Sequence, residues 1–292
     1  ALGRPPFFAL ILDKSLHSDT AYLAGWLYIV PIFFTAVSSP WWGRLADKYG
    51  KKPLLLRAQL GLAGSFLLAG FAPNAWGFAL ALALQGLLGG TFAASNAYLS
   101  TVVSGAALTR SLNLMQWSAR AALVAAPAGL GLLMTIESPL ELYRYLAGLP
   151  LVAALLIARL QPAHPHEASA KRVTHTKGGA LEASASQIYA AQFAFVFATV
   201  LTFPYFVPFT QAGAEPASLA MAGLLFGIPH LVYLLCAMPL SRYLGQGHLL
   251  VTLSSSFLLI AGALVAQALF PTLAGLTAGR IAMGLGMTLG FF

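Results

Sequence analysis

The chain has 292 residues, of which 59% are hydrophobic and only 8% are charged, and its mean hydropathy is +0.79. Soluble domains carry about 25% charged residues, so this composition excludes a water-soluble protein and predicts an all-α integral membrane protein. The net charge of +8 does not indicate a nucleic-acid partner, because the positive residues fall between apolar segments. With Cys236 as the single cysteine, the sequence offers no intrachain disulfide and no cysteine-based metal site.

Successive apolar segments predict about ten membrane spans, because about 20 apolar residues cross a bilayer core of roughly 30 Å as a helix. Residues 1–12 are too short to span and are interpreted as the outer half of a first span that begins before residue 1. Spans 2 to 6 are predicted at residues 20–42, 53–72, 76–102, 112–136 and 145–160. Spans 7 to 10 are predicted at residues 187–210, 217–243, 248–269 and 272–292, and the chain is expected to continue beyond its apolar end.

Residues 161–186 form the one long polar stretch and divide the chain. They are rich in His, Pro, Ala, Ser and Lys without an apolar period, which predicts a disordered cytoplasmic linker. On either side we expect an N-terminal helical bundle, residues 1–160, and an incomplete C-terminal bundle, residues 187–292. His164 and His166 would suit a metal ion, but no cysteine or converging acid supports that reading, so a solvated linker is preferred.

The densest charged stretch, GRLADKYGKKP, occupies residues 43–53 between spans 2 and 3. It is interpreted as a short basic hairpin in which Gly43 and Gly50 set the turns, because glycine adopts positive φ without steric cost. Its lysines place it in the cytoplasm by the positive-inside rule. With the linker on the same side, only Lys14 and Arg144 of the basic residues in loops lie outside, which agrees with this orientation.

The pattern G-x-L-A-D-x-x-G-K-K in this stretch resembles the signature loop between spans 2 and 3 of the major facilitator superfamily. The flanking SPWW at residues 39–42 and LLLR at residues 54–57 resemble its drug-exporter branch. An ordinary solvated basic loop is the plain alternative, but it does not require this spacing of glycines and aspartate. The resemblance implies two parallel six-helix bundles that rock around a central site, in a multi-pass transporter of the bacterial inner membrane.

The resemblance also implies a cytoplasmic gate, in which Asp47 meets a helix N-terminus or a cation of the facing half. The predicted gate residues are Gly43, Asp47, Lys48, Gly50, Lys51 and Lys52. In span 5, APAGLG at residues 126–131 resembles a degenerate form of the Gly- and Pro-rich antiporter motif, and Pro127 is expected to kink the helix. This motif favours export, although a plain packing role for its small residues is equally open.

Neither an enzyme nor an ATP-driven pump is indicated, because the chain has no G-x-x-x-x-G-K-[ST] loop and no Ser/His/Asp constellation. The resemblance favours a secondary transporter over a channel or a scramblase-like membrane protein. We expect a monomer in the lipid bilayer that moves a small molecule, uses protons as the coupling ion and needs no cofactor. His230 in span 8 is the candidate proton carrier, because histidine titrates near neutral pH. A His230 that is only hydrogen-bonded in the bundle, or a carboxylate in spans outside this sequence, are the alternatives.

Three arginines fall inside spans, namely Arg4, Arg120 and Arg280. Counted from the span ends at about 1.5 Å per residue, each reaches a depth of roughly 12 Å, near the middle of the membrane. An arginine at this depth is expected to face a cavity or a partner. No carboxylate is predicted within a span, so the substrate becomes the predicted partner. Further substrate contacts are expected from Gln85, Asn96, Gln116, Trp117 and Tyr205.

These arginines predict export of an anion, with a carboxylate-type siderophore or a citrate-like metabolite as the best fit, since guanidinium groups bind carboxylates bidentately. Two alternatives stay open. The arginines could instead bind backbone carbonyls or an acid outside this sequence. The protein could also be a polyspecific exporter of hydrophobic drugs, for which the aromatic residues Phe203, Tyr205 and Phe206 of span 7 would suit the cavity.

Overall fold

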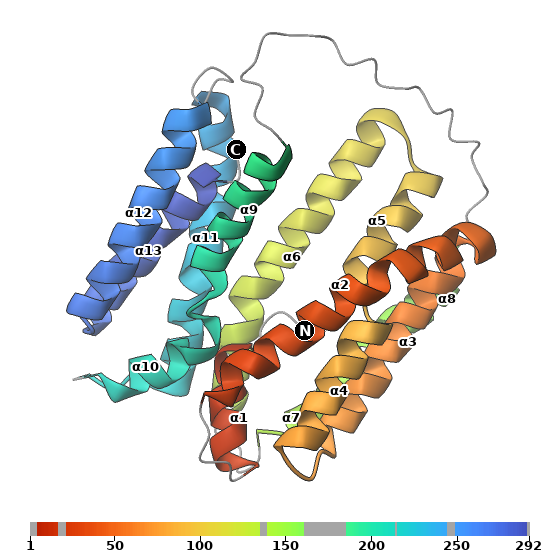
Figure 1. Ribbon diagram of the computed structural model, residues 1–292, viewed down its shortest axis with the longest axis horizontal. Helices are drawn as coiled ribbons and strands as arrows, with labels where there is room; N and C mark the ends of the chain where they lie inside the picture. Colours follow the sequence, from red (N-terminus) through yellow and green to blue (C-terminus); the bar gives the residue numbers. More distant parts are fainter. Residues whose placement is uncertain are drawn as a thin grey trace.

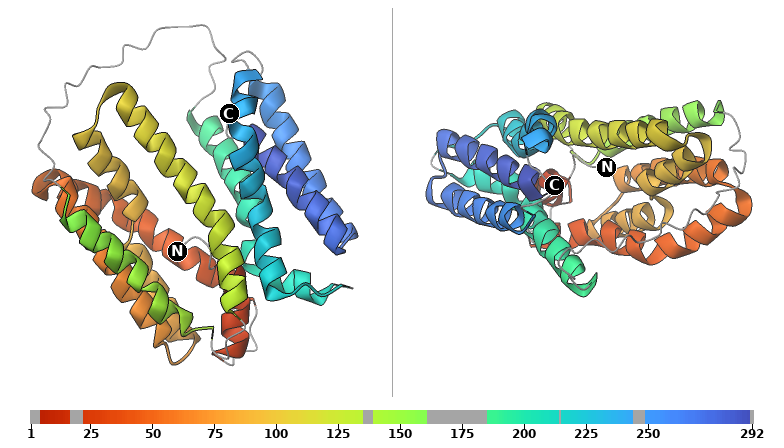
Figure 2. Two further views of the ribbon diagram at one scale, coloured as in Figure 1. Left: turned by 180° about the vertical axis from the view of Figure 1, so that it is seen from behind. Right: turned by 90° about the horizontal axis from the view of Figure 1, so that it is seen from above.

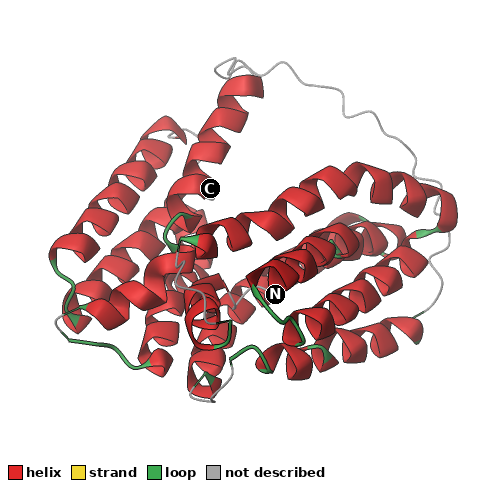
Figure 3. Ribbon diagram, turned by 60° about the horizontal axis from the view of Figure 1, so that its bottom comes forward, coloured by secondary structure: helices red, strands yellow, loops and turns green. Residues whose placement is uncertain are grey.

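Helices make up every regular element within the residues that the computed structural model describes, which are 5–16, 22–134, 139–160, 185–213, 215–243 and 249–290 (Figures 1 and 3). The N-terminal group contains η1 (Pro5–Phe7), α1 (Phe8–Lys14), α2 (Leu23–Tyr49), α3 (Lys51–Gly70), α4 (Ala75–Leu88), α5 (Thr91–Val102), α6 (Gly105–Leu133), α7 (Leu142–Leu146) and α8 (Gly148–Ala158). The C-terminal group contains α9 (Ala185–Val200), η2 (Phe203–Tyr205), α10 (Phe206–Ala212), α11 (Leu219–Tyr243), α12 (Leu249–Leu269) and α13 (Leu273–Gly290). Six helical stretches of this described part are long and apolar enough to cross a membrane.

The two groups approach each other at one end of the molecule and spread apart at the other (Figures 1 and 2). The contact between them is formed chiefly by α6 and α11. The spread end is where α2 ends, α8 ends and α9 begins, and we call it the linker end. This is the end that the positive-inside rule predicts to face the cytoplasm. Nearly all of the predicted linker lies outside the described residues, and residues 185 and 186 belong to the start of α9.

The basic stretch between α2 and α3 is more helical than predicted. Helix α2 continues to Tyr49, so Gly43 lies inside it and the expectation that Gly43 sets a turn is wrong. Residues 44–49 contain no helix breaker, which explains why the helix persists through them. Gly50 alone makes the turn, with a φ of 95° and its N–H bonded to Ala46 O at 3.0 Å.

Two further connections differ from the sequence prediction. The predicted polar loop around residues 109–111 is wrong, because α6 already begins at Gly105, where φ is 58°. Its polar residues do not interrupt a helix, since none of them is glycine or proline. The segment predicted as the external loop 137–144 contains the start of α7 at Leu142, while residues 135–138 lie outside the described part.

The predicted span 4 is divided into α4 and α5 by a pair of glycines. Gly90 has a φ of 77°, so the helical hydrogen-bond ladder stops there. Trp42 Nε1 donates to Leu87 O at 2.7 Å, and the Arg57 Nη2 donates to Gly89 O at 3.5 Å. The Arg57 guanidinium also lies 3.3 Å above the Trp42 ring centre. The break is therefore sustained inside the membrane by side chains that bind the freed carbonyls.

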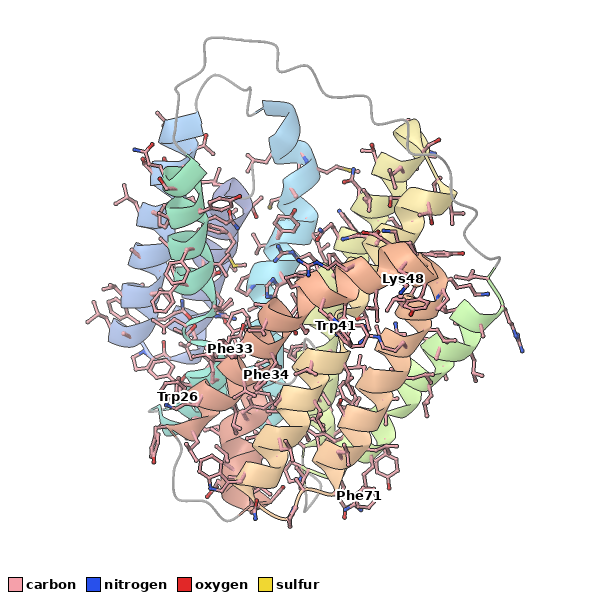
Figure 4. All side chains as sticks on the ribbon, turned by 45° about the vertical axis from the view of Figure 1, so that its right-hand side comes forward. Trp26, Phe33, Phe34, Trp41, Lys48 and Phe71 are labelled. Carbon is pink, nitrogen blue, oxygen red and sulfur yellow. The ribbon has the colours of Figure 1, made fainter. Side chains whose placement is uncertain are left out.

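Helix α2 carries a row of large apolar side chains on its exposed side. Trp26, Phe33 and Trp41 are 64%, 58% and 54% exposed, and Figure 4 shows them following one another along the helix. Their spacing is close to two helical turns, which keeps them on one face. An exposed apolar face of this kind suits a helix that is surrounded by lipid rather than water.

Candidate functional site

Small residues bring α6 and α11 into close contact. A Cβ added at Gly223 would overlap the Pro127 carbonyl, and one at Gly227 would lie 3.1 Å from Val124 O. Gly131 of α6 faces the start of α11 equally closely. Glycine removes the side chain that would otherwise hold two helices apart. The small residues around Pro127, for which close packing was one expectation, therefore meet α11, and we call this contact the α6–α11 seam.

A polar cluster lies at the middle of the seam. Arg120 Nη1 of α6 lies 3.5 Å from His230 Nδ1 of α11, and the Arg120 guanidinium carbon lies 4.8 Å from the centre of the Tyr233 ring. A guanidinium can only donate, so in this contact His230 Nδ1 is the acceptor and the ring proton is on Nε2. His230 is buried, with the rings of Phe203 and Phe226 beside it.

Arg280 of α13 is only 1% exposed and is bound by backbone oxygens of α11. Its Nε donates to Leu225 O at 3.1 Å and its Nη2 to Phe226 O at 2.7 Å, while its guanidinium carbon lies 4.2 Å from the Phe206 ring centre. In a regular helix, Leu225 O would accept from residue 229. Pro229 has no N–H, so Arg280 supplies the donor that this proline removes.

Arg120 and Arg280, which are the two predicted anion-binding arginines within the described residues, do not line a common cavity. Arg280 is bound by backbone carbonyls of α11, which corresponds to the alternative in which a buried arginine binds the backbone. Arg4 lies outside the described residues. Arg120 does line a cavity, so it is the arginine whose position is compatible with a ligand in this conformation.

A central cavity of about 550 Å³ lies between the two groups. It is lined by Pro5, Phe8, Tyr28, Pro31, Ile32, Thr35, Ala36, Gln85, Leu123 and Phe203. The walls thus come from η1, α1, α2, α4 and α6 of the N-terminal group and from η2 of the C-terminal group. Gln85, a predicted substrate residue, is here, and no carboxylate is among these lining residues. Apart from Thr35, Gln85 and the Tyr28 hydroxyl, the walls offer apolar contacts.

The other predicted substrate residues are dispersed. Gln116 lines a cavity of about 930 Å³ inside the N-terminal group, together with Arg120. Tyr205 lines a cavity of about 440 Å³ beside α12. Asn96 and Trp117 line neither of these two cavities nor the central one. One conformation therefore does not gather the predicted set around a single ligand position.

Tyr205 instead joins the two groups at the end opposite the linker end. The Gly25 N–H donates to Tyr205 Oη at 3.2 Å, and that hydroxyl donates to Tyr22 O at 3.1 Å. Gly25 is in the first turn of α2, where backbone N–H groups have no partner within the helix. Tyr205 therefore caps α2 from the facing group, which contributes to closure at this end.

The basic hairpin contacts its own group. Asp47 Oδ1 pairs with Lys51 Nζ at 2.7 Å, and the Asp47 side chain is 74% exposed. Lys52 Nζ donates to Ala158 O at 3.0 Å and also to Leu160 O, both at the end of α8. A cation at a helix C-terminus is favourable because the last carbonyls carry partial negative charge. The hairpin thus links α3 to α8, while the facing group is spread away at this end (Figure 1).

Asp47→Asn is expected to impair transport while expression and thermal stability stay nearly unchanged. An exposed ion pair contributes at most about 1 kcal/mol, so its loss does not unfold the protein. The predicted gate role needs the carboxylate in the opposite conformation, in which the two groups come together at the linker end. Transport by the variant in inverted vesicles checks this.

Lys51→Gln is the matched control for Asp47→Asn, because it removes the same ion pair and keeps the carboxylate. The gate role requires the aspartate variant to lose clearly more transport than the lysine variant. Equal transport by the two variants would show that Asp47 acts only through Lys51.

Several residues of the central cavity were not predicted from sequence. Phe8, Tyr28 and Thr35 line it, and Tyr233 lies against Arg120. In an apolar span, an aromatic or threonine that faces a cavity has the same neighbours in sequence as one that faces lipid. These residues could have been predicted only by knowing which helices pack together, because the helix contacts decide which face of each helix is internal.

A set of apolar helices in two groups, enclosing a cavity between them, defines a multi-pass membrane transporter. A family model described as Major Facilitator Superfamily matches residues 5–292, and the chain belongs to this superfamily of secondary transporters rather than to an enzyme family. The fold is similar to the "Crystal structure of D-xylose-proton symporter", with a TM-score of 0.67 over 99% of this chain and 76% of that chain at 11% identity. The predicted fold class is thereby confirmed.

Proteins that are similar in sequence match a smaller part of the chain than this solved structure does. "Multidrug resistance protein MdtG" of Citrobacter koseri is 42% identical over 101 residues, which are 34% of this chain and 25% of that protein. The protein of the same name from Salmonella arizonae is 41% identical over 101 residues, with the same shares. The chain therefore matches about a quarter of the length of these relatives.

Proposed function

We propose that the chain acts as an exporter of hydrophobic small molecules in the bacterial inner membrane, working by alternating access. The observation that carries this proposal is the central cavity between the two groups, whose walls are mainly aromatic and aliphatic. Its volume of about 550 Å³ lies within the roughly 300–1,000 Å³ of drug-sized sites. The names of the relatives, which are multidrug resistance proteins, support the same substrate class.

Such a cavity favours broad selectivity. Apolar contacts depend on area rather than direction, so ligands of different shape can be bound by the same aromatic walls. Thr35 Oγ1 is already bonded to Pro31 O at 2.7 Å and lies 3.1 Å from Gly86 O. Few directional groups therefore remain to reject a ligand, and polyspecific transport follows from this chemistry.

An anionic cargo is the second candidate, and Arg120 is the observation that favours it. Among the described residues of the α6–α11 seam, Arg120 is the cationic side chain that lines a cavity. A carboxylate-type siderophore or a citrate-like metabolite would need several cations. Arg280 is engaged by Leu225 and Phe226, so this conformation supplies one arginine rather than a converging set.

Transport in inverted vesicles separates the two candidates. Accumulation of a neutral hydrophobic dye and of citrate is measured in the protein and in its Phe203→Ala and Arg120→Gln variants. We expect dye accumulation, which Phe203→Ala lowers because it truncates a wall of the central cavity. Phe197→Ala is the matched control, since Phe197 is 50% exposed and lines none of the described cavities.

Citrate accumulation that is lost in Arg120→Gln, with no dye accumulation by any of the proteins, would replace the first candidate by the second. Equal dye accumulation in Phe203→Ala and in the parent would remove the central cavity from the proposal.

Alternating access suits the geometry of the two groups. In this conformation they are close at the end where Tyr205 caps α2 and apart at the linker end (Figure 2). Rocking about the α6–α11 seam would close the linker end and open the other, exposing the central cavity on the opposite side. Export then requires the substrate to enter from the cytoplasm or inner leaflet and to leave after this change.

His230→Gln is expected to abolish proton-driven accumulation while substrate exchange down its own gradient continues. Glutamine keeps a polar side chain beside Arg120 but cannot take up a proton. His230 is 2% exposed and its Nδ1 faces Arg120, so protonation there would break the contact across the seam. Proteoliposomes with and without an imposed pH gradient measure both activities.

The control for His230→Gln is Asn113→Ala, which alters an exposed neutral side chain of α6 that lines none of the cavities above and should change neither activity. If His230→Gln retains full accumulation under the pH gradient, the proton carrier must be another group. If both proton-driven accumulation and exchange are lost, the histidine is needed for the seam itself.

A further inference from the structure

A second cavity lies inside the N-terminal group and shares only Leu123 with the lining of the central one. It measures about 930 Å³, with α6 on one side and α3, α5 and the ends of α7 and α8 on the other. Helix α6 packs mainly against α11, and α6 residues between Met115 and Leu133 line this cavity. We call it the lateral cavity.

The lateral cavity is long and runs along α6. Its lining residues on α6 run from Met115 to Leu133, which corresponds to about 27 Å at 1.5 Å per residue. A bilayer core is roughly 30 Å thick. The cavity thus has the length of an extended hydrocarbon chain rather than the compact shape of a folded or ring-shaped ligand.

The two ends of the lateral cavity differ in chemistry. Most polar side chains of the lining lie toward the linker end, namely Gln59, Ser95, Gln116, Ser118 and Arg120, while Thr91 lies at the start of α5. Beyond Arg120, every α6 residue that lines the cavity is alanine, leucine or glycine. Leu146 and Leu149 continue this apolar end on α7 and α8. One charged, hydrogen-bonding end and one hydrocarbon end match a molecule with a head and a tail.

From this arrangement we propose that the lateral cavity binds a single-chain amphiphile with an anionic head group, either a carboxylate or a phosphate. The head would lie by Arg120, whose planar guanidinium matches both groups. No acidic side chain lines the cavity, so nothing there favours a cationic head. The tail would extend past Gly129 toward Leu133.

The rim of the lateral cavity indicates that the amphiphile comes from the bilayer. Phe92, Leu133 and Leu149 line it and are 41%, 50% and 67% exposed. An apolar, exposed rim on a membrane-embedded helix group is open to lipid chains. This site does not depend on the proposed export function, since its occupation can be measured without any transport.

Binding of radiolabelled dodecanoate to the purified full chain in zwitterionic nanodiscs tests the proposal. We expect saturable binding that unlabelled dodecanoate and dodecyl phosphate displace and that dodecyltrimethylammonium does not. Arg120→Gln should weaken it by at least about tenfold, because hydrogen bonds to charged groups contribute about 1.5–3 kcal/mol. Whichever anion displaces the label better identifies the preferred head.

Filling the apolar end supplies the second arm. A Cβ added at Gly129 meets no atom within 4 Å, so the ring of Gly129→Phe can occupy the cavity and should abolish binding. Gly64→Phe is the matched control, because Gly64 of α3 also has open space and does not line the cavity. Ala126→Leu is a smaller filling variant, in case Gly129→Phe does not give a monodisperse protein.

The proposal is overturned if the cationic amphiphile competes as well as dodecanoate, which would indicate nonspecific uptake of hydrocarbon chains. It is also overturned if Gly129→Phe and Ala126→Leu both bind dodecanoate like the Gly64→Phe control. Loss of binding in the two filling variants and in Arg120→Gln, with the control unchanged, supports it.

Discussion

Arg280→Met is expected to lower the stability of the C-terminal group by about 2–3 kcal/mol, because two buried carbonyls lose their charged donor. The side chain is 1% exposed and donates to Leu225 O and Phe226 O of α11. Methionine fills a similar space but donates nothing. Transport should be lost as well, since the same turn of α11 carries His230 into the seam.

A second substitution tests the reason for this loss. Pro229→Ala restores the N–H that Leu225 O lacks, so the double variant Pro229→Ala, Arg280→Met should regain about 1 kcal/mol relative to additivity. Pro239→Ala is the matched control, because Pro239 also lies within α11 and is exposed, away from Arg280. Thermal unfolding in detergent, measured for each single and double variant, gives the coupling free energy between positions 229 and 280.

Additive effects of Pro229→Ala and Arg280→Met would contradict the role of Arg280 as the donor for this proline. If Arg280→Met kept full stability and lost only the transport of anions, the arginine would instead be a substrate residue, as the sequence first suggested. The stability of Arg280→Lys should fall between those of the parent and of Arg280→Met. A single ammonium cannot reproduce the two hydrogen bonds of a guanidinium.

Sequence alone was sufficient for the helical membrane fold. Each span is a run of apolar residues, and the charges at its ends mark the turns, so class and approximate bounds follow from one-dimensional patterns. Gly43 and Gly89 show the limit of such patterns. Gly43 remains helical, whereas the backbone breaks after Gly89 because Trp42 and Arg57 can bind the carbonyls released there.

The candidate site was less accessible to sequence for the same reason. Depth along a span placed Arg120 and Arg280 at similar levels, but depth does not reveal which face a side chain occupies. Arg120 lines a cavity, whereas Arg280 is engaged by a helix that lies more than 50 positions earlier in the chain. A buried donor is placed by its tertiary partner, so the role of Arg280 depends on Pro229 and not on its own neighbours in sequence.

Gly223→Leu is expected to shift the protein away from the conformation described here and to reduce transport by at least about tenfold, which corresponds to ~1.4 kcal/mol. A Cβ at this position would overlap the Pro127 carbonyl in the half of the seam that lies opposite the linker end. Overpacking a close contact is unfavourable by about 1–3 kcal/mol, comparable with the few kcal/mol that separate two conformations of a transporter. The groups should therefore separate at this end.

Labelling of a cysteine in the central cavity measures that separation. Thr35 lines this cavity, so Thr35→Cys is placed in a Cys236→Ser background and exposed to a membrane-impermeant maleimide in right-side-out vesicles. In the parent, contacts such as Tyr205 with α2 limit access from outside, and labelling is expected to be slow. Gly223→Leu should raise the labelling rate as transport falls.

Gly262→Leu is the matched control for Gly223→Leu, because Gly262 of α12 has no atom within 4 Å of an added Cβ and lies away from the seam. It should leave both labelling and transport near the parent values. If Gly223→Leu labels as slowly as Gly262→Leu, close approach at Gly223 does not hold the two groups together at this end. If it labels faster but still transports at the full rate, the seam closes this end without limiting turnover, and the rocking step must be controlled at the linker end, where Asp47 lies.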